Sequence, residues 1–192
     1  MKFIPYDETV AQKTVEEYKK NKDTYKGNRT TGHVAEALVR HYFGLPMQEN
    51  KEDVGYDLVI DGYTVDVKNI QDNPVHHKYD TWVVDDYKPL TAQFYLFTYC
   101  DPNTKQIALV GYLPVDEVKR CRHVVSGQPL YKGNKYRAHC PAYTVDSYKM
   151  WLLNGKSDVG VEMATIATMR PCYREERTGK IVVREPSGAR YL

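Results

Sequence analysis

Apolar and polar residues alternate from residue 55 to 69 in a pattern that predicts a β-hairpin. Asp61-Gly62 separates two β-rich runs, and this dipeptide favours a two-residue type I′ turn, which needs positive φ at both central positions. A two-residue loop also fixes the register of the strands. We therefore expect Leu58 to lie opposite Val65.

The two faces of this hairpin differ in polarity, because successive strand side chains point to opposite sides. One face is apolar and is expected in the core: Leu58, Ile60, Tyr63, Val65 and Val67. The other face is expected to carry Asp57 opposite Asp66, with Lys68 two residues further along. Carboxylates in direct opposition repel each other. Either a hard divalent cation or the lysine offsets that repulsion.

The pattern along the rest of the chain predicts two helices before the hairpin and mostly strands after it. The predicted elements are helices 9–20 and 32–43, strands 81–84, 93–99 and 106–112, a short helix 114–120, a helix 143–153, and a second hairpin around Thr178-Gly179. Thr31 is expected to cap the second helix, and Gly44 is expected to end it.

Glu36 lies on the flank of the apolar stripe of the second helix. The stripe consists of Ala35, Leu38, Val39 and Tyr42. A half-buried glutamate in that position is costly unless it has a cationic partner. The alternative is a glutamate whose carboxylate reaches water.

Three of these elements, in this order, resemble the PD-(D/E)XK nuclease superfamily, whose fold is restriction-endonuclease-like. Residues 32–36 (G-H-V-A-E) resemble the helix motif of the family. Residues 55–57 (G-Y-D) stand for its Pro-Asp, without the proline, and residues 66–68 (D-V-K) for its Asp-x-Lys. The resemblance covers about residues 30–112.

The resemblance implies an α/β fold of the α+β kind, with a mixed central sheet flanked by helices. In this family a helix and a further strand follow the lysine of the motif. We expect one domain over residues 1–192, with a core at about 30–112 and a basic C-terminal elaboration at about 113–192.

The resemblance also implies a metal-dependent deoxyribonuclease, with Glu36, Asp57, Asp66 and Lys68 as its catalytic residues. Asp57, Asp66 and the Val67 carbonyl would hold Mg²⁺ or Mn²⁺, and Glu36 would reach the same ion through water or help to hold a second one. Lys68 would orient the attacking water or stabilise developing charge. The alternative function is a catalytically silent module of the same fold that binds nucleic acid or protein.

Candidate nucleic-acid contacts lie beside the motif and in the basic stretch from 122 to 143, where aromatic residues are interleaved. They are Gln71, His33, Arg29, Lys132, Lys135 and Arg137. A solvated, loop-rich surface is the alternative for the basic stretch. The His76-His77 pair, and the pairs Cys121/His123 and His139/Cys140, are the weaker metal-site candidates, against scattered surface residues.

The totals agree with a soluble chain that is large enough for a substantial core. The chain has 192 residues and a net charge of +2, too small by itself to identify a nucleic-acid binder. Without a signal-peptide pattern or a run of ~18 apolar residues, we expect a cytoplasmic protein with no membrane partner. Its four cysteines, Cys100, Cys121, Cys140 and Cys172, are expected to be reduced. Homo-oligomerisation stays open.

Overall fold

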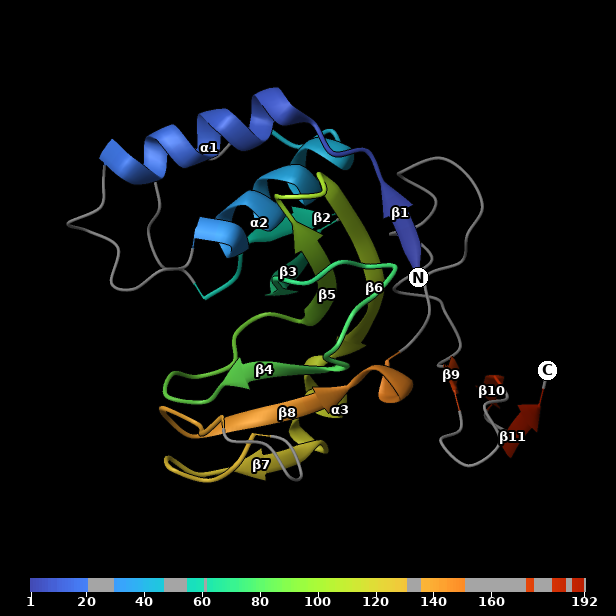
Figure 1. The fold of residues 1–192 in the computed structure, drawn as a ribbon. Helices are drawn as coiled ribbons and strands as arrows, with labels where there is room; N and C mark the ends of the chain where they lie inside the picture. The colour runs from blue at the N-terminus through green and yellow to red at the C-terminus, as the bar shows by residue number, and fades with distance from the viewer. Residues whose placement is uncertain are drawn as a thin grey trace.

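The computed structural model describes residues 1–20, 30–46, 55–60, 62–130 and 136–150, and the backbone of 172–174, 181–185 and 188–191. Within these residues the chain is a mixed α+β protein (Figure 1). Its helices are α1 (Glu8–Lys20), α2 (Thr30–Tyr42), α3 (Val115–Lys119) and the short 3₁₀ helix η1 (Ser147–Lys149). None of the described helices is long and apolar enough to cross a membrane.

A five-stranded mixed sheet forms the centre of the molecule. In spatial order its strands are β1 (Lys2–Ile4), β6 (Gln106–Pro114), β5 (Phe94–Asp101), β3 (Tyr63–Ile70) and β2 (Leu58–Ile60). Strands β3 and β5 are parallel, and every other neighbouring pair is antiparallel. The predicted mixed sheet is therefore confirmed, while the restriction-endonuclease-like core remains a prediction.

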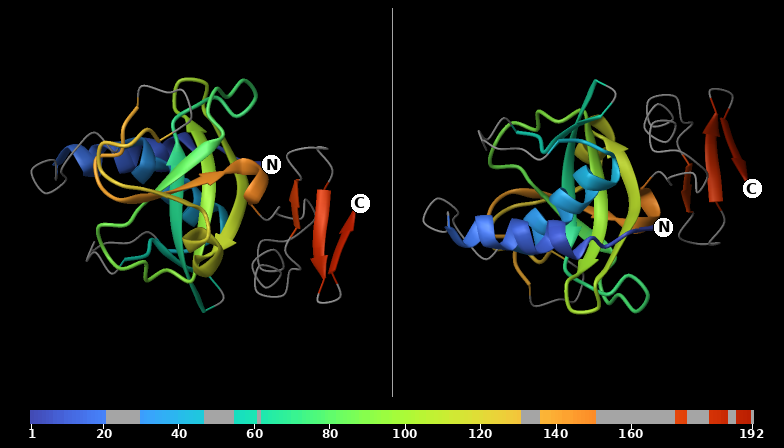
Figure 2. Two further views of the ribbon diagram at one scale, coloured as in Figure 1. Left: turned by 90° about the horizontal axis from the view of Figure 1, so that it is seen from below. Right: turned by 90° about the horizontal axis from the view of Figure 1, so that it is seen from above.

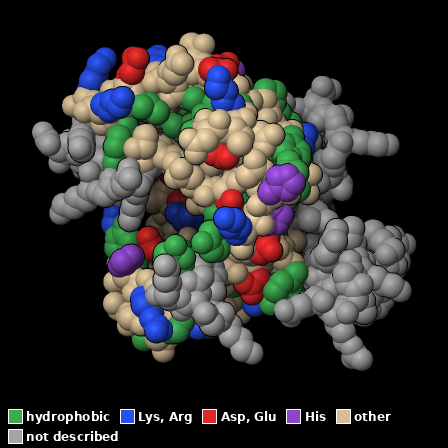
Figure 3. Space-filling view, viewed as in Figure 1, with side chains coloured by type: hydrophobic (Ala, Val, Ile, Leu, Met, Phe, Trp, Pro, Cys, Tyr) green, Lys and Arg blue, Asp and Glu red, His purple; other side chains and the backbone are tan. Residues whose placement is uncertain are grey.

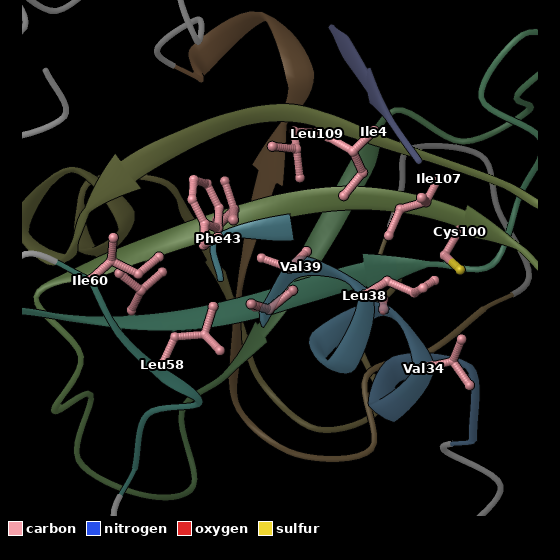
Figure 4. Packing of buried hydrophobic residues seen from close by; sticks show 14 of the residues in the cluster. Ile4, Val34, Leu38, Val39, Phe43, Leu58, Ile60, Cys100, Ile107 and Leu109 are labelled. Atoms are coloured by element: carbon pink, nitrogen blue, oxygen red, sulfur yellow. The ribbon is translucent and has the colours of Figure 1, made fainter. Parts of the chain in front are cut away.

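Helices α1 and α2 cover one face of this sheet, with α1 as the outer layer, nearest the viewer in the view of Figure 2 from above. Helix α2 buries its apolar stripe against the hairpin and against β5 and β6. Figure 4 shows Leu38, Val39 and Phe43 among side chains of the sheet. Those sheet residues are Leu58, Ile60, Ile107 and Leu109. The predicted stripe is thus the inner face of α2, with Tyr42 only partly buried.

A second, three-stranded sheet lies on the opposite side of the central sheet. It consists of β4 (Thr81–Asp85), β8 (Ala142–Asp146) and β7 (Arg122–Val124), with β8 in the middle and both pairs antiparallel. Trp82 and Val145 from this sheet pack with Phe97 and Tyr99 of β5 and with Val118 of α3. Helices therefore cover one face of the central sheet, and the second sheet covers the other.

Two expectations about this side are wrong. The helix predicted over 143–153 is strand β8 followed by η1, because Tyr-Thr-Val at 143–145 suits a strand and β8 pairs with β4 and β7 on its two sides. The helix that the resemblance places after the lysine is also absent. Residues 71–93, all described, carry strand β4 instead.

The ends of α2 show how its sequence sets its length. The helix begins at Thr30, so Thr31 is not its N-cap as predicted; the Thr31 hydroxyl donates to Gln71 Oε1 over 2.9 Å. Gly44 ends the helix as predicted, with φ at 63°. Hydrogen bonds from Gly44 N to His41 O and from Leu45 N to Arg40 O form a Schellman motif.

The C-terminal strands form a separate three-stranded antiparallel sheet: β9 (Cys172–Arg174), β10 (Ile181–Glu185) and β11 (Gly188–Tyr191). Pairing of Arg174 with Ile181 confirms the predicted second hairpin. Thr178-Gly179, around which it was predicted, lies outside the described residues.

Two glycines, one in the first turn of α2 and one shortly before β2, are expected to respond oppositely to replacement by alanine. Gly55 has φ at 82°, and a Cβ there would lie 2.1 Å from Thr91 Oγ1, so Gly55→Ala should destabilise the fold by about 1 kcal/mol or more. Gly32 lies in α2, and no described atom outside its own helix turn comes within 4 Å of such a Cβ, so Gly32→Ala should stabilise the fold by about 0.5–1 kcal/mol. Urea unfolding of both variants measures the two signs, and equal signs would contradict this account.

Candidate active site

The hairpin of β2 and β3 has the register that its sequence predicts. Leu58 pairs with Val65, and the turn residue Gly62 has φ at 83°. The apolar face is core: Leu58 and Val65 are each 1 % exposed. Tyr63, also assigned to that face, is only partly buried. The polar face is consequently turned away from α2.

Asp57 departs from the direct opposition to Asp66 that the register predicts. Its backbone N–H donates to Val65 O over 3.0 Å, and Val65 already pairs with Leu58, so the regular ladder ends there. Its carboxylate oxygen Oδ2 accepts the Val67 N–H over 2.6 Å. A short side-chain bond to the partner strand thus replaces a ladder position, and it fixes the Asp57 carboxylate beside β3.

Asp66 and Lys68, on the polar face of β3, form an ion pair. Lys68 Nζ lies 2.6 Å from Asp66 Oδ2, with 30 % of the lysine side chain and 14 % of the aspartate side chain exposed. The ammonium group of Lys68 also donates a hydrogen bond to this largely buried carboxylate. Lys68 therefore acts as the immediate counter-charge of Asp66, the arrangement that the sequence offered as the alternative to a metal ion.

Glu36 is half-buried, as predicted, with 24 % of its side chain exposed. Its Oε2 lies 3.5 Å from His33 Nδ1, one turn earlier on α2. Arg40, one turn later, also interacts electrostatically with Glu36. The sequence analysis missed Arg40, although the spacing of four residues from Glu36 is a recognisable signal for a helical ion pair.

Burial and neighbouring negative charges raise the pKa of both aspartates of the site. Burial raises the pKa of Asp57 well above its usual value, and the charges of Glu36 and Asp66 raise it further. Burial also raises the pKa of Asp66, although Lys68 opposes this effect. For Lys68 burial works to lower the pKa, but Asp66 and Asp57 outweigh it and the pKa is raised. The four predicted catalytic side chains thus form one electrostatic unit.

Two further residues that the sequence did not single out contribute to this unit. Tyr95 lies beside Asp66 on the parallel strand β5, is buried, and has its pKa raised by that burial and then by Asp66. Asp85, at the end of β4, adds negative charge that raises the pKa of Asp66. Only the pairing of β3 with β5 and the packing of β4 bring them close, so no local pattern could have identified them.

A hollow opens on the surface between α2 and β4, as the space-filling view of Figure 3 shows from the same side as Figure 1. Basic and acidic side chains are visible in its depth. Asp66 and Lys68 are on β3, which lies between these two layers. Lys68 on this strand is partly exposed.

The described side chains form no ready-made cluster of metal ligands. Among the described residues, no three His, Cys, Asp or Glu side chains lie close enough together to hold a metal ion. The weaker metal-site candidates, at the His76-His77 pair and at the two cysteine–histidine pairs, also lack support among these residues. His77 pairs with Asp80 at 2.9 Å, and His123 pairs with Asp86 at 3.0 Å. Cys100 and Cys121 are buried free thiols, and Cys140 Sγ donates to Asp85 Oδ1 over 3.5 Å.

The candidate nucleic-acid contacts have mixed placements. Gln71 is exposed at the end of β3, where it meets Thr31 of α2. His33 is largely enclosed, with 17 % of its side chain exposed and its ring 5.5 Å from that of Tyr18. Arg137 is exposed. The remaining three lie outside the described residues: Arg29, Lys132 and Lys135.

Comparison with known proteins gives no relative from which to transfer a function. No family model, no curated protein and no solved structure matches the chain. The functional argument therefore depends on the residues of the site itself.

We expect Asp57→Asn to stabilise the metal-free protein at pH 7 by about 1 kcal/mol, the usual gain when a strained functional residue is relieved. Asparagine keeps an oxygen that can accept the Val67 N–H but removes a charge that burial, Glu36 and Asp66 disfavour. A carboxyl whose pKa is raised by folding favours the folded state at low pH, and this contribution is lost as the pH rises.

The advantage of Asp57→Asn over the wild type should accordingly shrink as the pH is lowered from 7 to 4. Urea unfolding in EDTA at several pH values measures both effects. The exposed residue Asp116 on α3 supplies the control Asp116→Asn, which should change stability little. A variant that is less stable than the wild type at pH 7 would contradict the assignment of Asp57 as a strained carboxylate.

Proposed function

We propose that this protein is a metal-dependent nuclease that hydrolyses phosphodiester bonds in DNA. One observation carries the proposal: Glu36, Asp57, Asp66 and Lys68 come from three separate elements and interact electrostatically at one partly buried place. Isolated charges of this kind are costly to bury, so a fold that gathers them favours a functional site. Their identities are those of a Glu…Asp…Asp-x-Lys nuclease motif.

The donor set fits a hard divalent cation. Asp57 and Asp66, with the Val67 carbonyl between Asp66 and Lys68, offer the oxygen ligands that Mg²⁺ and Mn²⁺ prefer. The largely buried carboxylate of Asp66 is balanced by its hydrogen-bonded ion pair with Lys68. Glu36 would reach the same ion through water or help to hold a second one. A cation there would supply a Lewis acid that activates water and polarises the scissile phosphate.

Protein side chains would carry out the remaining parts of the hydrolysis. Lys68, which is ion-paired with Asp66 and so carries its charge, would donate hydrogen bonds to a phosphate oxygen and stabilise the negative charge that develops on it. Water adds to phosphorus as the P–O bond to the leaving sugar oxygen breaks, and that oxygen takes up a proton. Asp57 is anchored through Val67 N–H, so its carboxylate needs little reorganisation to act.

A DNA substrate agrees with three exposed side chains of the protein. Exposed Tyr136 and Arg137 provide one aromatic and one basic side chain in the stretch where the sequence predicts backbone and base contacts. Gln71 is exposed directly after β3 and is the described polar candidate nearest in sequence to Lys68.

The test is cleavage of labelled single-stranded DNA, duplex DNA and RNA in Mg²⁺ or Mn²⁺. Asp66→Asn and Lys68→Gln should each lower the cleavage rate by about 100-fold or more, since each removes a group that acts on the reacting atoms. EDTA should abolish cleavage by the wild type. Exposed counterparts give matched controls: Asp116→Asn on α3 and Lys105→Gln, whose ammonium pairs with Glu8, should cut at the wild-type rate.

Three other outcomes would count against parts of the proposal. Cleavage of RNA alone would correct the substrate. A wild type that binds DNA but cuts none of the three substrates would favour the catalytically silent binding module. Cleavage that survives both Asp66→Asn and Lys68→Gln would locate the activity elsewhere, or in a contaminant.

A further inference from the structure

Arg40 makes an unusual pair of contacts from the last turn of α2. Its guanidinium donates through Nη2 to the backbone carbonyl of Asp57 and through Nη1 to the carbonyl of Pro46, the latter over 3.1 Å. Pro46 follows the end of α2, and Asp57 directly precedes β2. One side chain therefore ties together the two ends of the connection between the helix and the hairpin.

The charge of Arg40 is also placed where the site needs it. The guanidinium interacts favourably with both Glu36 and Asp57, while its partial burial opposes the charged form. Lys68 is the other cation described in this unit, and it is paired with Asp66. Arg40 thus approaches the carboxylates from the α2 side, whereas Lys68 approaches them from β3.

Asp57 is consequently held at three points. Its N–H donates to Val65 O, its carboxylate accepts from Val67 N–H, and its carbonyl accepts from Arg40. The first two bonds fix it to β3, and only the third fixes it to the helix that carries Glu36. Without the Arg40 bond, Arg40 would no longer restrain the distance between Asp57 and Glu36.

We infer that Arg40 is a positioning residue of the proposed site: its guanidinium fixes the Asp57 backbone against α2, so that Asp57 and Glu36 are presented together. The inference deepens the proposed nuclease function, because it concerns how the carboxylates of that site are held. Lysine cannot replace arginine in this role, since an ammonium keeps the charge but not the planar fork that meets two carbonyls.

The chain offers a matched control for this fork. Arg122, at the start of β7, also donates to two backbone carbonyls, through Nη2 to Pro129 over 3.0 Å and through Nη1 to Leu130 over 3.3 Å. Arg122→Lys therefore removes the same kind of contact on a different part of the fold. Arg40→Lys isolates the geometry of the fork, and Arg40→Gln removes the charge as well.

The first readout is hydrogen exchange of the metal-free protein, followed by NMR. The Val67 amide reports on Asp57, because the Asp57 carboxylate accepts its N–H. In Arg40→Lys this amide should exchange about tenfold faster relative to the buried β6 amide of Leu109, the effect of loosening about one hydrogen bond. Arg122→Lys should leave the ratio of the two rates unchanged. If Arg40→Lys also leaves that ratio unchanged, the inference is overturned.

The second readout is the binding of Mn²⁺ alone, measured by the EPR signal of the free ion. Arg40→Lys should weaken binding about tenfold, as changes to groups that orient metal ligands do, and excess Mn²⁺ should restore most of the cleavage rate. Arg122→Lys should bind as the wild type does. Unchanged Mn²⁺ affinity in Arg40→Lys, despite faster Val67 exchange, would reduce Arg40 to a structural role and overturn the inference.

The two readouts separate this inference from the proposed function. A wild type that binds no Mn²⁺ and cuts no nucleic acid would refute the metal-dependent site. The exchange experiment would still decide whether Arg40 positions Asp57, because it needs neither metal nor substrate. Arg40→Gln, compared with Arg40→Lys, then shows whether the lost charge adds to the lost geometry.

Discussion

The architecture of this protein depends on keeping several carboxylates close together in a partly buried place. Like charges in low dielectric repel strongly and lose hydration, so they persist only where fixed groups offset both costs. Lys68 does so for Asp66 and the Val67 amide for Asp57. These groups belong to β3, whose opposite face is secured by apolar packing against α2. The stability of the core therefore maintains the strained polar face.

The two layers on the central sheet explain how this arrangement remains accessible. Helix α2 brings Glu36 and Arg40 from one side, and the second sheet brings Asp85 from the other. Strand β3 lies between these two layers, and Lys68 on its polar face keeps 30 % of its side chain exposed.

Much of the site could be predicted because its signals are local. The turn at Gly62 fixed the hairpin register, and periodicity placed Glu36 on α2. Strand β8 was missed although its Tyr-Thr-Val suits a strand, because its partner β4 lies more than 50 residues earlier in the chain. The hydrogen bond that Val67 N–H donates to the Asp57 carboxylate was missed, because such a side-chain contact between strands produces no periodic pattern in the sequence.

The bond pattern of Arg40 has an evolutionary consequence. Since one guanidinium joins the carbonyls of Pro46 and Asp57, the two ends of the connection between α2 and β2 are held together. Lengthening a connection whose ends are already joined costs little entropy, because the cost grows only with the logarithm of its length. The connection is thus a place where the chain can gain residues, and so acquire new contacts, while its two ends stay in position.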